Sequence, residues 1–112
     1  MHMTALATDN LARLISDKRD HLLRLREFGV RQQTLIESGD MAGLLRMIAA
    51  KQHLIGGLQQ IEAELNVFRD DDPNGRTWRA ESDRNRCRTV AEECRQLLSD
   101  VLQLERDNES RM

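Results

Sequence analysis

The chain has 112 residues, which is enough for one domain with one modest core. Only 3% of the residues are aromatic, and Leu, Ala, Arg, Glu and Gln dominate, a composition that favours helices over a sheet. The net charge is −2, and neither residues 1–39 nor residues 87–112 form a basic stripe, so the sequence argues against nucleic-acid binding.

The first predicted helix covers residues 8–37, with Thr8 or Asp9 as its N-cap. Large apolar residues recur along it at helical spacing among many charged residues, so we expect one packed face and one solvated face. Ser38-Gly39 is expected to end this helix, because glycine suits the left-handed conformation of a C-cap.

The second predicted helix covers residues 40–68, with Asp40 as its N-cap. Its heptad seam consists of Leu44, Met47, Lys51, Leu54, Leu58, Ile61, Leu65 and Phe68. A second apolar stripe consists of Met41, Leu45, Ile48 and Ile55. A helix with two apolar stripes and few charges needs two neighbours, so this helix is predicted to lie in the middle of the bundle.

Two features of the second helix are unusual. Lys51 lies on the seam, where we expect its stem to pack and its amine to reach solvent. Gly56-Gly57 lies inside the helix, where each glycine costs about 1 kcal/mol relative to alanine. The pair indicates either a hinge or groove for a partner helix, or close packing of another helix of this chain.

The segment from Asp70 to Gly75 is the clearest break, since it contains the only proline and an Asn-Gly turn. The third predicted helix covers residues 76–110, beginning near Pro73 or Thr77, with Trp78 folded back as an anchor. Its seam, which the second helix is expected to cover, consists of Cys87, Val90, Cys94, Leu97, Val101, Leu104 and Asn108. Both cysteines are predicted to be reduced core residues.

The predicted fold class is therefore all-α: residues 1–112 form a single domain of three long antiparallel amphipathic helices in a coiled-coil-like bundle. The predicted core includes Leu54, Leu58, Ile61, Leu65, Val90, Cys94, Leu97 and Val101. No apolar run has the roughly 18–20 residues needed to cross a bilayer. The N-terminal MHMTALATDN lacks the basic and apolar regions of a signal peptide, so we expect a cytoplasmic protein without membrane insertion.

No motif for catalysis, metal binding or a cofactor is present, so the expectation is a non-enzyme without metal or cofactor. His2, His21 and His53 lack metal-ligand spacing, and Asp70-Asp71-Asp72 is typical of a solvated loop in which one residue caps the next helix. All-helical chorismate mutases are similar in size, and Lys51 would suit a substrate-binding cation. Their expected set of further Arg and Lys residues does not follow.

The third helix has a second apolar stripe formed by Ala91, Leu98 and Leu102. Exposed leucines in line usually indicate a partner or a self-contact, whereas the alternative is that the first helix covers them. The candidate partner-binding residues are Leu98, Val101, Leu102, Asn108 and Met112.

Two stretches carry a resemblance to a known family. GDMAGLLRMIAAKQHLIGGLQQIEAEL is similar to the central region of flagellar export chaperones of the FlgN kind, where a helix follows a short turn, carries a Lys-Gln pair and continues rich in leucine. CRQLLSDVLQLERDNESRM is similar to their C-terminal helix. Longer members have further tail residues beyond the position of Met112, so a tail-based contact with the export machinery is in doubt here.

The resemblance implies a chaperone of the flagellar type III export system. Such proteins bind helical C-terminal segments of hook-associated proteins at the hook–filament junction and deliver them to the export apparatus. Two other interpretations stay open: a structural coiled-coil protein that forms a homo-oligomer, and an adaptor that prevents assembly or regulates it, without a flagellar role.

Overall fold

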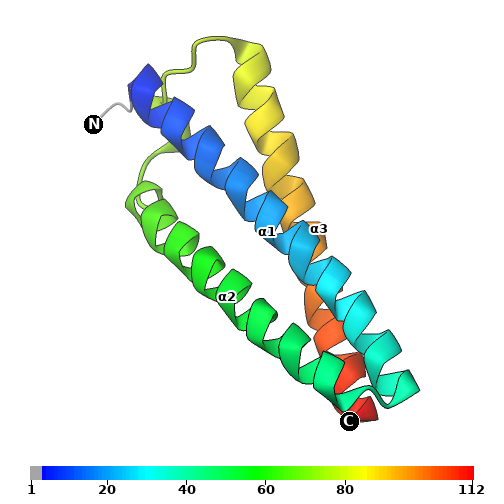
Figure 1. The fold of residues 1–112 in the computed structure, drawn as a ribbon. Helices are drawn as coiled ribbons and strands as arrows, with labels where there is room; N and C mark the ends of the chain where they lie inside the picture. The colour runs from blue at the N-terminus through cyan, green and yellow to red at the C-terminus, as the bar shows by residue number, and fades with distance from the viewer. Residues whose placement is uncertain (1–3) are drawn as a thin grey trace.

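The chain forms an elongated bundle of three helices, 54 × 20 × 19 Å, as predicted. The computed structural model describes residues 4–112, and in it α1 (Ala5–Ser38), α2 (Met41–Leu65) and α3 (Glu81–Arg111) are the long elements (Figure 1). Two short 3-10 turns, η1 (Asn66–Phe68) and η2 (Pro73–Gly75), lie between α2 and α3. Consecutive helices run antiparallel, so the first and third helices run parallel to each other (Figure 1).

The turn between α1 and α2 follows the prediction. Gly39 has a φ of 74°, which places it in the left-handed region, where glycine avoids the strain that a side chain would cause. The Asp40 side chain accepts a hydrogen bond from the Gly43 amide at 2.9 Å and so caps α2. These two residues close the α1–α2 hairpin tightly.

The first helix begins earlier than predicted. Thr4, rather than Thr8 or Asp9, is the N-cap, because its side chain accepts from the Ala7 amide. Thr8 lies inside the helix and is buried. Its hydroxyl donates to the Thr77 carbonyl oxygen at 2.7 Å, so it fastens the segment before α3 to the first helix.

The third helix begins at Glu81, later than the predicted residue 76. Pro73 instead opens the η2 turn, where the Asp72 side chain accepts from the Asn74 amide at 3.0 Å. Trp78 is half-buried against the apolar cluster near the ends of α1 and α2, which confirms the predicted fold-back. Similarly, the second helix ends at Leu65 and passes into η1.

The middle helix of the bundle is α1, so the predicted central position of the second helix is wrong. The first helix packs closely against both others, while the backbones of α2 and α3 stay farther apart from each other. Consequently α1, not α2, covers the seam of the third helix. The second apolar stripe of α2 has no neighbouring helix at its start, since Met41 is 62% and Leu45 is 65% exposed, whereas Ile48 and Ile55 are half-buried.

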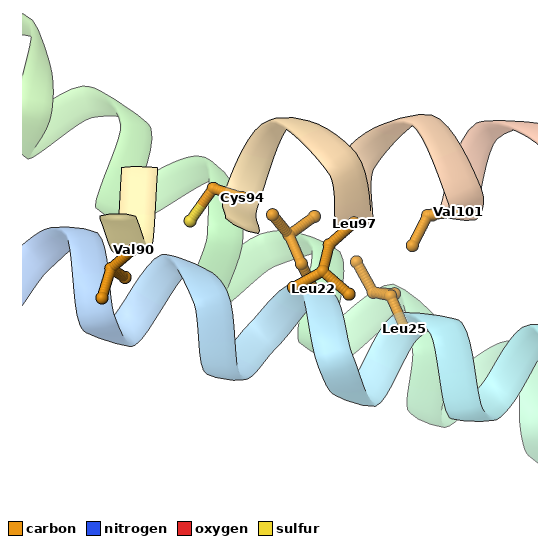
Figure 2. Close-up of a cluster of buried hydrophobic side chains, with 6 residues drawn as sticks. All are labelled: Leu22, Leu25, Val90, Cys94, Leu97 and Val101. Atoms are coloured by element: carbon orange, nitrogen blue, oxygen red, sulfur yellow. The ribbon is translucent and has the colours of Figure 1, made fainter. Parts of the chain in front are cut away.

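The core consists of two clusters along α1. In the first, Leu22 and Leu25 of α1 pack against a row of residues from α3: Val90, Cys94, Leu97 and Val101 (Figure 2). The second joins Leu11 and Leu14 to Ile61 and Phe68. The predicted core is confirmed for Ile61 and for these four α3 residues, whereas Leu54, Leu58 and Leu65 are only half-buried.

Glycines set the spacing of the helices at two places. A Cβ on buried Gly29 would lie 3.2 Å from Leu104, so α1 and α3 approach closely there. A Cβ on Gly57 would lie 2.7 Å from Nε2 of His21, so this glycine makes room for the imidazole of α1. Gly56 is exposed with nothing near it, and α2 runs unbroken through both residues. Close packing thus accounts for Gly57 but not for Gly56.

Candidate functional site: a groove between α2 and α3

The separation of α2 from α3 leaves a groove whose floor is α1. Two adjoining hollows of about 320 and 270 Å³ form it, and they share Leu11, Ile15 and Ala91 in their lining. The walls come from the end of α2, the segment that follows it and the first half of α3. The apolar side chains that line this α2–α3 groove are Leu11, Ile15, Leu65, Phe68, Trp78, Ala91 and Leu98.

A polar bridge crosses between α2 and α3 beyond the hollows. The amine of Lys51 on α2 forms an ion pair with Glu105 on α3 and donates to Oε1 of Gln32 on α1 at 3.1 Å. One side chain thereby ties all three helices together.

Lys51 is 7% exposed, so the prediction that its amine reaches solvent is wrong. The amine stays inside because Glu105 and Gln32 supply the polar partners that a buried cation requires. Burial lowers the pKa of Lys51, and the negative charge of nearby Glu109 partly offsets this effect.

Apolar residues share the helix faces that carry the two ends of this bridge. On α2, Ile48 and Ile55 lie three residues before and four after Lys51, spacings that share a helix face. On α3, Leu98 and Leu102 lie seven and three residues before Glu105 and share its face in the same way. Leu98 is 40% and Leu102 is 48% exposed, so no helix of this chain covers them.

The five candidate partner-binding residues lie in two different environments. Leu98 and Leu102 are at the surface beside the groove, and Met112 is exposed at the end of the bundle. Val101 is buried in the first core cluster, and Asn108 is 1% exposed and donates to the Gly29 carbonyl oxygen at 3.0 Å. The side chains of Val101 and Asn108 therefore contact α1 and are not at the surface.

Cys94 lines the groove wall, but its thiol has an ordinary packing environment. Its Sγ lies 3.6 Å from the Ile15 carbonyl oxygen, to which it donates. Burial raises the pKa of Cys94, and that of Cys87 for the same reason, so both thiols are neutral near pH 7. A neutral buried thiol is a poor nucleophile, so both cysteines act as small core residues.

Among residues 4–112, no three His, Cys, Asp or Glu side chains come together in a way that would hold a metal ion. His2 lies outside the described residues. In the same part of the chain, no helix combines the length and apolar character that crossing a membrane requires.

The sequence reasoning missed one property of the groove, its charge. Five arginines, hereafter the arginine rim, line it: Arg69, Arg76, Arg84, Arg88 and Arg95. Glu62 is the only acidic residue among the described residues of its lining. Between Arg69 and Arg95 the sequence interleaves these arginines with acidic residues, so only their helical spacing, as at Arg84 and Arg88, hints that they share a face.

In comparisons with known proteins, no protein-family model matches this chain, and neither the curated proteins nor the solved structures give a match.

Proposed function

We propose that this protein binds an amphipathic helix of another protein in the α2–α3 groove. The observation that supports this proposal is the open side of the bundle between α2 and α3. There the two helices flank an apolar floor formed by α1, and Leu98 and Leu102 are exposed along one face of α3. A helix laid into such a groove with its apolar face down is a common mode of peptide recognition. The bound helix would complete a four-helix arrangement.

The energetics favour a helix with apolar anchors of its own. Fully burying a leucine contributes about 1.5–3 kcal/mol, so covering two half-exposed leucines contributes about 1 kcal/mol each. That is too little for stable binding, because association itself costs at least about 4 kcal/mol. The partner must therefore insert its own large side chains between Leu65, Ala91 and Leu98, which line the hollow there.

The biological role that we propose is that of a flagellar type III export chaperone of the FlgN kind. Its clients would be helical C-terminal segments of hook-associated proteins, which it delivers to the export apparatus. The support is the similarity of the two helical stretches described above, together with a groove of the kind such clients need. An unassembled coiled-coil segment exposes an apolar stripe, and covering that stripe prevents premature association.

A second candidate function is self-association as a structural coiled-coil subunit. The observation that favours it is the pair Met41 and Leu45, two large apolar side chains more than 60% exposed on the second stripe of α2. In this case a second copy of the chain would cover α2 and the groove together.

The test is a binding titration with a synthetic C-terminal helical peptide of a hook-associated protein, followed by fluorescence anisotropy. The groove variant is Leu98→Asp with Leu102→Asp. The control is Val30→Asp, because Val30 is 52% exposed and lies on the other side of the bundle between α1 and α3. We expect the groove variant to lose at least about tenfold in affinity and the control to bind as wild type does.

Circular dichroism establishes that each variant is folded. If the folded groove variant binds as tightly as wild type, the peptide site is elsewhere. If wild type does not bind the peptide but dimerises in sedimentation, with the dimer lost in the groove variant, the structural role replaces the chaperone role.

A further inference from the structure

The α2–α3 groove is strongly cationic although the chain as a whole carries a net charge of −2. Its lining contains the arginine rim and Lys18, but only Glu62 as a carboxylate among the described residues. Lys18 and Glu62 neutralise each other, since they form an ion pair at 2.6 Å. The charge that remains is that of the arginines, and it lies along both edges of an apolar floor.

Most of the arginine rim has no acidic partner. Within residues 4–112, Arg69, Arg84 and Arg88 form no ion pair, whereas half of the ten arginines elsewhere on the bundle, such as Arg26 with Asp100, do. Arg95 pairs with Glu92. Arg76 donates from Nη2 to the Phe68 carbonyl oxygen at 3.2 Å, while its buried Nε has no hydrogen-bond partner.

Folding alone does not account for this arrangement. Arg84 and Arg88 are four residues apart on α3, and like charges at that spacing destabilise a helix by a few tenths of a kcal/mol. Arg95 lies seven residues after Arg88 and so continues the same edge. A row of exposed cations beside an apolar groove is instead complementary to a ligand with an apolar centre and anionic edges.

We propose that the helix bound in this groove carries acidic residues on the flanks of its apolar stripe, and that the arginine rim selects it. This inference rests on the proposed function, to which it adds the chemistry of the partner. The rim and Leu98 cover residues 84–98 of α3, about 21 Å by helical rise, which matches about four turns of a bound helix. Aspartate or glutamate beside the apolar positions would reach Arg84, Arg88 and Arg69.

An acidic amphipathic helix fits better than a nucleic acid. A phosphate backbone would satisfy the arginines but would leave Leu11, Ile15 and Ala91 of the floor without an apolar partner. The acidic helix satisfies both parts of the lining at once. Its guanidinium–carboxylate contacts lie at the edge of the interface, where they set specificity and the rate of association more than affinity.

The test uses three synthetic peptides of about four turns with one apolar stripe and with Glu, Gln or Lys at the flanking positions. We expect the Glu peptide to bind about tenfold more tightly than the Gln peptide at low salt and the Lys peptide to bind most weakly. Salt screens exposed charges, and the Debye length is only about 3 Å at about 1 M salt. The ratio of the Glu-peptide affinity to the Gln-peptide affinity should therefore fall about threefold or more when the salt is raised to that concentration.

A pair of variants on α3 localises the effect. Arg88 lines the groove, while Arg86, two residues earlier and also exposed, lines a hollow on the opposite side of the helix. We expect Arg88→Glu to lower the affinity for the Glu peptide and to raise the affinity for the Lys peptide, each about fivefold. Arg86→Glu should change neither affinity by more than about twofold.

The outcomes separate the two proposals. If the Glu and Gln peptides bind equally and Arg88→Glu acts no differently from Arg86→Glu, the rim does not select the partner, although the helix-binding function stands. If no peptide binds, the proposed function fails as well. If an oligonucleotide displaces the Glu peptide and binds equally well to the Leu98→Asp, Leu102→Asp variant, the groove is a phosphate site and the inference is wrong.

Discussion

At the scale of single residues, Asn108 shows how a polar side chain is built into the bundle. It is 1% exposed, and its amide donates to the Gly29 carbonyl oxygen at a point where α1 and α3 approach closely. A carbonyl inside a helix already accepts one backbone bond, so Asn108 uses its second lone pair. The small Gly29 and the hydrogen bond together hold the two helices at this spacing.

Replacing Asn108 by alanine should therefore destabilise the fold. We expect a loss of about 1–3 kcal/mol in the free energy of unfolding, measured by urea denaturation, because a buried hydrogen bond and its packing volume are removed. Ser110→Ala, at an exposed position two residues later, is the control and should cost less than about 0.5 kcal/mol. Unchanged stability of Asn108→Ala would show that α1 and α3 do not need this contact.

Polar residues on a seam were also the hardest for sequence reasoning to interpret. The heptad spacing placed Lys51 and Asn108 on packed faces correctly. It could not reveal their partners, because Gln32, Glu105 and Gly29 belong to other helices, far away in the sequence. The amine of Lys51 was therefore predicted to reach solvent, and Asn108 was predicted both on the seam and among the partner-binding residues.

At the scale of the helices, the sequence predicts where each helix breaks but not which helices pack against each other. Gly39, Asp40 and Pro73 act locally, so the sequence around each of them is enough to place a turn. Which helix lies in the middle depends on how the apolar faces of all three helices fit together. The apolar second stripe of α2 indicated a second neighbour, yet Met41 and Leu45 of that stripe are exposed. An exposed apolar face and a buried one have the same sequence pattern.

The glycine pair of α2 offers a matched comparison. We expect Gly56→Ala to stabilise the protein by about 0.5–1 kcal/mol, since alanine loses less backbone entropy in a helix and meets nothing within 4 Å. Gly57→Ala should stabilise less or destabilise, because its methyl must displace the His21 ring, whose Nδ1 lies 2.9 Å from the Asp17 carbonyl oxygen. Thermal unfolding followed by circular dichroism measures both.

The same variants address the hinge interpretation. If α2 bends at Gly56 when a helix binds, Gly56→Ala weakens peptide binding even though it stabilises the free protein. Equal affinity of Gly56→Ala and wild type would rule out a hinge at this position.

At the scale of the whole molecule, the bridge of Lys51, Gln32 and Glu105 closes the end of the α2–α3 groove. We expect Glu105→Ala to cost about 1–3 kcal/mol, because it leaves the buried Lys51 cation without its carboxylate. Lys51→Met should cost less, since methionine fills a similar volume and Glu105, whose side chain is 34% exposed, can turn to water. Urea denaturation measures the free energy of unfolding of the two variants. A larger loss in Lys51→Met than in Glu105→Ala would mean that the packing of the Lys51 side chain contributes more to stability than its ion pair does.

The Lys51 variant also predicts a pH dependence. Because burial lowers the pKa of Lys51 below its ordinary value of 10.5, the unfolded chain binds more protons than the folded one between these two values. The free energy of unfolding that this group contributes therefore rises with pH in that window. The stability difference between wild type and Lys51→Met should shift in favour of wild type as the pH rises toward 10.5.

The charge of the groove is likewise a property of the whole molecule. Averaged along the chain, basic and acidic residues cancel, which is why no basic stripe was found in the sequence. Folding separates them: the arginines of α3 and of the segment after α2 gather on one side, whereas Glu93 and Asp100 of α3 pair with arginines of α1.

The parallel pairing of α1 with α3 has a consequence for how the protein is made. Contacts such as Asn108 with Gly29 and Cys94 with Ile15 join residues 79 positions apart. During synthesis, the α1–α2 hairpin leaves the ribosome first, while Leu22 and Leu25 still lack the residues of α3 that cover them. The main core forms only when the last helix emerges, and long-range pairing of this kind slows folding and prolongs the exposure of apolar surface. The protein thus passes through a stage of its synthesis in which the apolar face of its own first helix is uncovered.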